Sequence, residues 1–132
     1  MIGLDTNVMV RYLAQDDKEQ SREATRLIED LTEEEPALLS LVVVVETVWV
    51  MEELYGASRA RVAEIIEQLL RVRTFIVDDA EIAWQALSGY RKTSADFADH
   101  VIARSCTYKG CQRIMTFDKK AARDCGMTLL RS

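Results

Sequence analysis

Short apolar runs alternate along the chain with longer segments in which apolar residues repeat at helical spacing. Ala37–Leu39 has the length of a short buried strand, whereas the apolar residues of Ser58–Leu70 recur at the i, i+3, i+4 and i+7 positions of an amphipathic helix. Strands that alternate with helices in this way are typical of a parallel sheet covered by helices on both faces. The hydrophobic pattern therefore predicts an α/β fold.

The boundaries of these elements follow from apolar spacing, capping residues and glycines. The segment Leu41–Tyr55 contains a run of β-branched valines, which leaves a longer strand as the alternative. Its length and spacing nevertheless favour a helix. The predicted strands are Ile2–Leu4, Ala37–Leu39, Thr74–Val77, Arg113–Met115 and Met127–Leu130. The predicted helices are Thr6–Leu13, Asp17–Leu31, Leu41–Tyr55, Ser58–Leu70, Asp79–Arg91, Asp96–Tyr108 and Lys119–Cys125.

Length and composition agree with one globular domain. The chain has 132 residues, of which 48% are hydrophobic and 30% charged, so we expect residues 1–132 to form a single domain. Asp5 and Arg11 interrupt the only apolar stretch near the start, and we therefore predict no signal peptide. The apolar run around Leu38–Val45 is too short to span a bilayer. We expect a cytoplasmic protein that does not bind membranes.

Charge is distributed unevenly between two parts of the chain. The net charge is −5, but Met1–Gly89 contains 8 basic and 18 acidic residues, whereas Tyr90–Ser132 contains 9 basic and 4 acidic residues. The carboxyl-terminal third is therefore a candidate surface for a phosphate backbone. Charge alone does not favour this interpretation, because lysine and arginine side chains are usually only solvated.

Four acidic residues lie near points where a predicted strand passes into a helix. They are Asp5, Glu46, Asp99 and Asp118. Acids at the carboxyl ends of parallel strands converge on one crevice, and converging carboxylates repel one another unless cations lie between them. The pattern therefore predicts a divalent metal site.

Each of these acids also has a simpler structural explanation. Asp5 and Asp118 are good helix N-caps, and one of the pair Asp96 and Asp99 can cap the helix that follows. Glu46 interrupts an apolar helix, where a buried arginine partner would satisfy it. Local capping does not explain why all four acids occur at the same end of a parallel sheet. We therefore favour metal binding.

The donor types indicate which metal the site would take. Carboxylate oxygens with few histidines select Mg²⁺ or Mn²⁺ rather than zinc. The three cysteines form an odd number without a C-x-x-C spacing, which also argues against a zinc site and against a disulfide framework. Such ions polarise phosphoryl oxygens and lower the pKa of a water nucleophile.

In their order and spacing, several short motifs resemble the PIN domain and, more closely, the VapC toxins of VapBC toxin–antitoxin modules. The resemblance covers essentially the whole chain. The motifs are Leu4-Asp5-Thr6-Asn7-Val8, Arg11-Tyr12-Leu13, Glu46 in its apolar helix, Asp96-Phe97-Ala98-Asp99 with Ile102-Ala103, and Thr116-Phe117-Asp118.

The resemblance implies a three-layer α/β/α sandwich with a central, mainly parallel five-stranded sheet. It also implies an endoribonuclease that depends on Mg²⁺ or Mn²⁺ and cleaves structured RNA such as tRNA or rRNA. Where many relatives have a small apolar residue, this chain has His100, which we expect at the surface or in a groove. The positions that match the acidic metal-binding quartet are Asp5, Glu46, Asp99 and Asp118. The accessory matches are Thr6 or Asn7 and Thr116, as polar residues that orient water, and Asp96, as a further acid.

The resemblance also implies partners. A VapB-like antitoxin would wrap the protein and push an arginine into the acidic pocket, and two copies of the chain would form a homodimer. We expect some apolar residues of the first two helices to pack in the core and the remainder to help form the antitoxin groove. These residues are Val8, Tyr12, Leu13, Leu27, Ile28 and Leu31.

Other functions compete with this interpretation. A haloacid dehalogenase-like phosphatase needs a second aspartate two residues after the first, and that position is Asn7. A receiver domain needs a phosphoacceptor aspartate after the third strand, where only Asp78 and Asp79 occur. A non-toxin PIN nuclease or a catalytically silent PIN binding module also remains open, although a pure scaffold has no need of the complete quartet.

Overall fold

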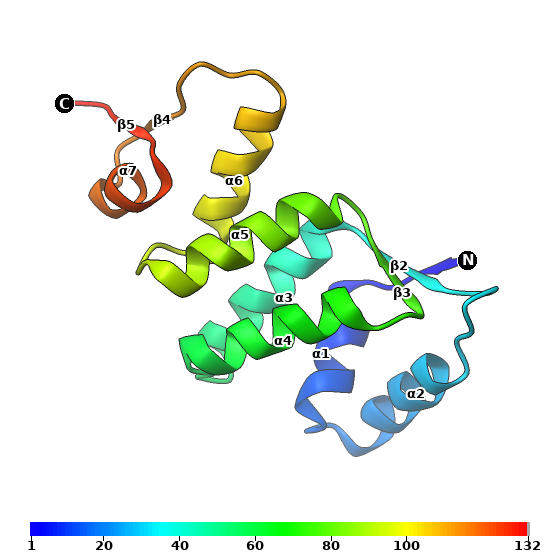
Figure 1. The fold of residues 1–132 in the computed structure, drawn as a ribbon. Helices are drawn as coiled ribbons and strands as arrows, with labels where there is room; N and C mark the ends of the chain where they lie inside the picture. The colour runs from blue at the N-terminus through cyan, green and yellow to red at the C-terminus, as the bar shows by residue number, and fades with distance from the viewer. Residues whose placement is uncertain (132) are drawn as a thin grey trace. The chain divides into compact units, whose positions relative to one another are not determined.

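The computed structural model describes residues 1–131. The chain forms two compact units, Met1–Ala80 and Glu81–Ser132 (Figure 1). Within the described residues, the elements are the seven helices and five strands that the sequence predicts, in the same order. No helix in residues 1–131 is long and apolar enough to cross a membrane.

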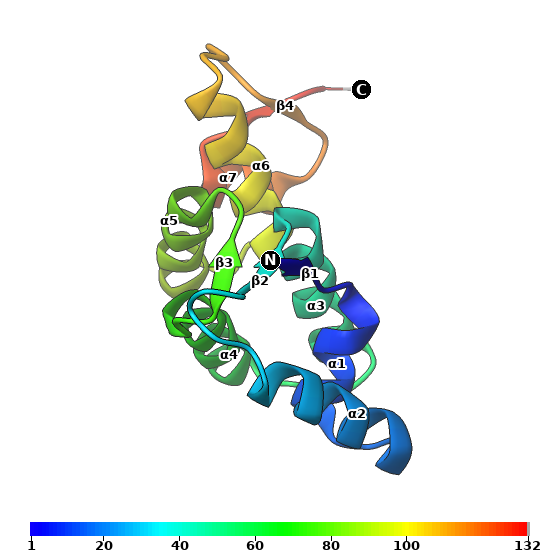
Figure 2. The ribbon, with the colours of Figure 1, turned by 90° about the vertical axis from the view of Figure 1, so that its right-hand side faces the viewer.

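The first unit contains a parallel sheet of three strands. Strand β2 (Ala37–Leu39) lies between β1 (Ile2–Gly3) and β3 (Phe75–Val77), as Figure 2 shows. Ile2 is paired with Ala37, and Ala37 with Phe75, in parallel register. All three strands therefore end at the same edge of the sheet, where β1 and β2 pass into helices.

Four complete helices belong to the first unit, and each begins at a side chain that accepts a hydrogen bond from its first turn. The caps are Asp5, Asp17, Ser40 and Ser58. The valine-rich segment is a helix, which excludes the longer strand. The helices are α1 (Thr6–Ala14), α2 (Lys18–Glu29), α3 (Leu41–Glu53) and α4 (Arg59–Arg71).

The core of the first unit forms where helix faces meet the sheet. Helix α4 contributes the predicted stripe, in which Val62, Ile65, Ile66 and Leu69 are all buried. Helix α1 packs against both α2 and α3. The remaining buried hydrophobic residues of this unit are Leu4, Met9, Val10, Ala24, Ile28, Ala37, Leu39, Val44, Val48, Met51, Ala63, Phe75 and Val77.

The second unit holds the other two strands as a parallel pair, β4 (Met115–Thr116) and β5 (Thr128–Leu129). Ala103, Ala121 and Met127 form a small core beside this pair. A second apolar contact brings the rings of Tyr90 and Phe97 together edge to face, with centroids 6.0 Å apart. The helices are α5 (Ala80–Lys92), α6 (Phe97–Tyr108) and α7 (Lys119–Cys125).

Strand pairing differs from the sequence expectation in one respect. The predicted strands occur within one or two residues of their expected bounds, but the described residues pair them as one sheet of three strands and one of two. The single five-stranded central sheet is therefore not confirmed. The physical reason is that a short apolar run indicates a buried strand without indicating which distant strand it pairs with.

His100 is buried rather than on the surface. Its side chain is only 4% exposed, and it lines a cavity of about 490 Å³ within the second unit. The ring nitrogen Nε2 lies 2.7 Å from Thr93 Oγ1, which also donates to the Gly89 carbonyl oxygen at 2.9 Å. The expectation of a surface position is therefore wrong, and His100 instead lines this cavity as a buried residue.

Gly89 provides the space that this ring occupies. A Cβ atom at position 89 would lie 2.6 Å from His100 Cε1 and still nearer to Nδ1, a separation at which one of the two must move. The ring is hydrogen-bonded and enclosed, so it has little freedom to give way. A side chain at this position would therefore force α5 and α6 apart.

We expect Gly89→Ala to lower the free energy of unfolding by about 1–2 kcal/mol. Overpacking a core destabilises a protein by about 1–3 kcal/mol, and the better helix propensity of alanine offsets up to about 1 kcal/mol of this. Urea denaturation measures the difference. Ser88→Ala, at an exposed position of the same helix, is the matched control and should not destabilise. Equal stability of the two variants would contradict the steric explanation.

Candidate functional site

Asp5 lies directly after β1 and caps α1. Its carboxylate is exposed, and Oδ1 accepts a hydrogen bond from the Val8 amide at 3.0 Å. Asp5 is therefore a helix N-cap, as one of the two interpretations of the sequence predicted. The second oxygen, Oδ2, has no hydrogen-bond partner within residues 1–131, so capping leaves half of the carboxylate available to a ligand.

Glu46 lies in α3 and is linked to the start of α1. The Thr6 hydroxyl donates to Glu46 Oε1 across 2.7 Å, so the residue that follows Asp5 also holds the second acid of the quartet. Glu46 is exposed in the structure. The expected burial of this carboxylate is therefore wrong, and so is the alternative of a buried arginine partner, because this face of the valine-rich helix is exposed. Asn7 is exposed as well.

Asp99 differs from the other acids because it is half-buried in the first turn of α6 and caps nothing. Burial raises the pKa of its carboxyl group, and repulsion from Asp96 and then Asp118 raises it further. Lys120 opposes this shift. A carboxylate held under these conditions favours the uncharged form or a bound cation.

Asp96 and Asp118 each stand at the start of a helix, but they are used differently. Asp96 caps α6 without a side-chain hydrogen bond to its first turn. Asp118 caps α7 with Oδ1, which accepts from the amides of Lys120 at 2.8 Å and Ala121 at 3.2 Å. Thr116 Oγ1 accepts from the Asp118 amide at 3.0 Å, which fixes the backbone where β4 ends.

The predicted site residues therefore occur as two groups, one in each unit. Asp5 and Thr6, at the start of α1, lie beside Glu46, which is in the second turn of α3 in the first unit. Asp96 and Asp118 both act electrostatically on Asp99 in the second unit. Residues 1–131 contain no group of three or more histidine, cysteine, aspartate or glutamate side chains placed closely enough to hold a metal ion. Convergence of the whole quartet stays a prediction.

Asp124 is a residue that the sequence analysis missed. Its side chain is 11% exposed, and Oδ2 accepts from both the amide and the hydroxyl of Ser94, each at 3.2 Å. The neighbouring Arg123 donates to Oδ1 at 2.7 Å and holds the pKa of Asp124 well below its usual value. These bonds join α7 to the segment before α6 and so position Asp96 and Asp99. No periodicity or motif in the sequence signals this contact.

Cys125 lies beside His100, with Sγ 3.5 Å from the ring nitrogen Nδ1. Burial first, and then the charges of Asp99 and Asp124, raise the pKa of this thiol to about 11. The thiol is therefore protonated at neutral pH and is a poor nucleophile. The pair is a packing contact and does not resemble a cysteine–histidine catalytic pair.

We expect Asp99→Asn to raise the stability of the metal-free protein at neutral pH. Because the folded-state pKa lies above the ordinary value of 3.8, the folded protein keeps this proton to higher pH, and stability falls as pH rises through that interval. Asparagine removes the effect. Urea denaturation in EDTA at about pH 7 and about pH 3 should show the larger gain at about pH 7. The same gain at both values would contradict this account.

Asp118 variants separate the capping role from any ligand role. Asp118→Ala loses both cap hydrogen bonds and should lower the free energy of unfolding by about 1 kcal/mol. Asp118→Asn keeps a capping oxygen and should remain within a few tenths of wild type, measured by the same denaturation. If both variants were equally destabilised, the carboxylate charge rather than the cap would matter.

Comparison with known proteins assigns the family. Searches of curated proteins and of solved structures gave no match. The family model of the PIN domain, by contrast, matches residues 2–125, a range that includes every acid described above. PIN domains are generally metal-dependent nucleases that bind divalent ions, which broadly indicates a hydrolase. The chain therefore belongs to the PIN domain family.

Proposed function

We propose that the protein is an endoribonuclease that depends on Mg²⁺ or Mn²⁺ and cleaves structured RNA such as tRNA or rRNA. The observation that carries the proposal is the family match over residues 2–125, which contains the complete quartet. The family accounts for a nuclease in general. RNA as the substrate and the metal requirement are supported by the motif resemblance and by the chemistry of the acids.

The donor set fits a hard divalent ion. Asp5 and Asp118 each use only Oδ1 in capping, and the carboxylate of Asp99 accepts no hydrogen bond within residues 1–131. Free carboxylate oxygens are the ligands that Mg²⁺ and Mn²⁺ prefer. When bound, such an ion polarises a phosphoryl oxygen and lowers the pKa of a water nucleophile. We propose that Asp5, Glu46, Asp99 and Asp118 hold it.

The accessory residues orient the four acids or lie next to them. Thr6 orients Glu46 through its 2.7 Å hydrogen bond, and Thr116 fixes the backbone from which Asp118 projects. Asp96 adds negative charge beside Asp99 and so increases the gain from a bound cation. Asn7 is exposed next to Thr6 and is available to a substrate or water.

We further propose that the chain acts as the VapC-type toxin of a toxin–antitoxin pair. A cavity of about 290 Å³ between α1 and α2 supports this role, because Val8, Ala24 and Leu27 line it and Leu27 is 40% exposed. Such a groove suits the apolar segment of a VapB-like antitoxin. The family resemblance also supports a homodimer, a cytoplasmic location and a five-stranded central sheet that would include all the strands.

Metal-dependent cleavage tests the proposal. Wild-type protein incubated with tRNA and rRNA should produce discrete new ends with Mg²⁺ or Mn²⁺ and none in EDTA, as mapped by end sequencing. Asp5→Asn and Asp99→Asn should each lower the cleavage rate by more than the roughly 10- to 100-fold that loss of an outer-shell partner costs. Asp30→Asn makes the same charge change at an exposed position outside the quartet and should cleave normally.

Two results would reject parts of this proposal. Undiminished cleavage by Asp5→Asn would exclude that residue as a ligand. Failure of the wild-type protein to cleave any RNA with either ion would exclude the nuclease and favour a PIN binding module.

A further inference from the structure

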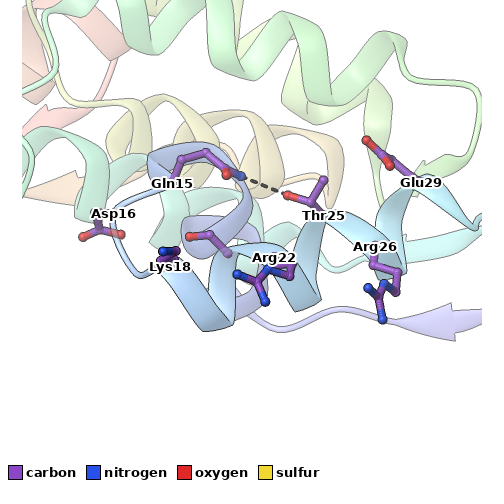
Figure 3. A pocket seen from close by; sticks show the side chains of 8 residues that line it. Gln15, Asp16, Lys18, Arg22, Thr25, Arg26 and Glu29 are labelled. Carbon is purple, nitrogen blue, oxygen red and sulfur yellow. Dashed lines mark hydrogen bonds between the residues drawn. The ribbon is translucent and has the colours of Figure 1, made fainter.

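A third cavity, of about 560 Å³, runs along α2 on the first unit (Figure 3). One face of α2 and the turn that precedes it line this cavity, and its most prominent residues are cations. Three of them, Lys18, Arg22 and Arg26, form what we call the α2 cationic row. The cavity is separate from the acids of the candidate site, none of which lines it.

The α2 cationic row has regular geometry. Its members follow one another at i, i+4 and i+8, so they lie about 6 Å apart along the helix axis. Figure 3 shows them side by side along α2. All three side chains are exposed, and within residues 1–131 none of them forms an ion pair. The row therefore presents three exposed, unpaired cations along one side of α2, with Glu19, Glu23 and Glu29 of the same helix nearby.

The two acids that line the cavity do not form ion pairs with the row within residues 1–131. Asp16 accepts hydrogen bonds from the Tyr55 hydroxyl at 2.6 Å and from Arg11 at 3.2 Å, so its carboxylate is already engaged. Glu29 lies at the far end of the cavity, and Figure 3 shows its side chain directed away from Arg26. Neither acid is therefore bonded to the row, and the three cations have their donor groups available to a ligand.

A buried hydroxyl points independently to a ligand that accepts hydrogen bonds. Ser21 lines the cavity and is only 3% exposed, yet its Oγ has no hydrogen-bond partner within residues 1–131. Buried polar atoms are rarely left without a partner. Nearby, Thr25 Oγ1 accepts from Gln15 Nε2 at 3.0 Å, which leaves the threonine proton free to donate. Hydroxyl donors next to cations are suited to phosphate oxygens.

We propose that the α2 cationic row binds the phosphodiester backbone of the RNA substrate. A row of three cations at regular spacing suits a polyanion with a charge on every unit, because each cation can contact a different charge. Guanidinium groups bind phosphate oxygens in a bidentate manner, and lysine adds a point charge. Backbone contacts of this kind position nucleic acid without reading its sequence. The inference rests on the proposed function, since it assigns a surface to the same substrate.

Salt-dependent binding tests the inference apart from cleavage. Fluorescence anisotropy with a labelled single-stranded RNA in EDTA, where cleavage does not occur, measures affinity between about 50 and 200 mM salt. The triple variant Lys18→Gln/Arg22→Gln/Arg26→Gln should bind at least about 10-fold more weakly at low salt. Its plot of log affinity against log salt should be shallower by about 2, because each phosphate contact to a single strand contributes roughly 0.7.

Two further variants act as controls. Arg61→Gln/Arg71→Gln removes exposed cations that are ion-paired with Glu64 and Glu67 on α4, and it should leave the slope unchanged. Ser21→Ala removes only the unpartnered hydroxyl. It should weaken RNA binding several-fold without lowering the midpoint of urea unfolding, whereas a purely structural serine would leave binding unaltered.

The outcomes separate this inference from the proposed function. Loss of RNA binding in the triple variant supports the row even if the wild-type protein proves unable to cleave. Two results would overturn the inference that the row binds RNA: an unchanged slope in the triple variant, or no binding of RNA by wild type at about 50 mM salt. Neither result bears on metal-dependent cleavage, which is tested separately. Tighter binding of a poly-glutamate peptide than of RNA would also overturn it, in favour of an acidic protein partner.

Discussion

The structure depends on how the backbone is satisfied where each parallel strand passes into a helix. The first amides of a helix have no acceptor within it, so a side chain at the N-cap must supply one. Asp5 does this after β1, Ser40 after β2 and Asp118 after β4. Aspartate at a helix start also gains from the helix dipole. A requirement of ordinary folding thus places negative charge at the carboxyl ends of the strands.

Capping and ligand binding do not compete for these residues. A cap occupies one carboxylate oxygen and orients the other, so Asp5 and Asp118 are positioned by the same bonds that stabilise their helices. Asp99 caps no helix, so it gains no stabilising hydrogen bond of this kind. It is half-buried, close to other carboxylates, and its pKa is raised. A residue that lowers the stability of its own fold is the kind expected at a functional site. Asp124, tied to Ser94, maintains that arrangement.

The net charge of the chain does not show where its charged side chains lie on the surface. The amino-terminal part has a net negative charge, yet three cations follow one face of α2. Acids of the same helix lie close to them, because Glu19, Glu23 and Glu29 are each three residues from an arginine of the row, but none of the three cations is ion-paired within residues 1–131. A protein with an overall negative charge can therefore present a local surface suited to phosphate, in addition to the basic surplus of Tyr90–Ser132.

The sequence by itself determined the elements and the identity of the acids. Strand β2 and helix α7 match their predicted bounds, and the other elements begin and end within a few residues of theirs, because apolar periodicity and capping act over single turns. Only the tertiary structure decided which strands pair, that Glu46 is exposed and bonded to Thr6, and that His100 fills the space at Gly89. These features depend on contacts between residues far apart in the chain. Burial and pairing of that kind arise when elements pack, and no local pattern encodes them.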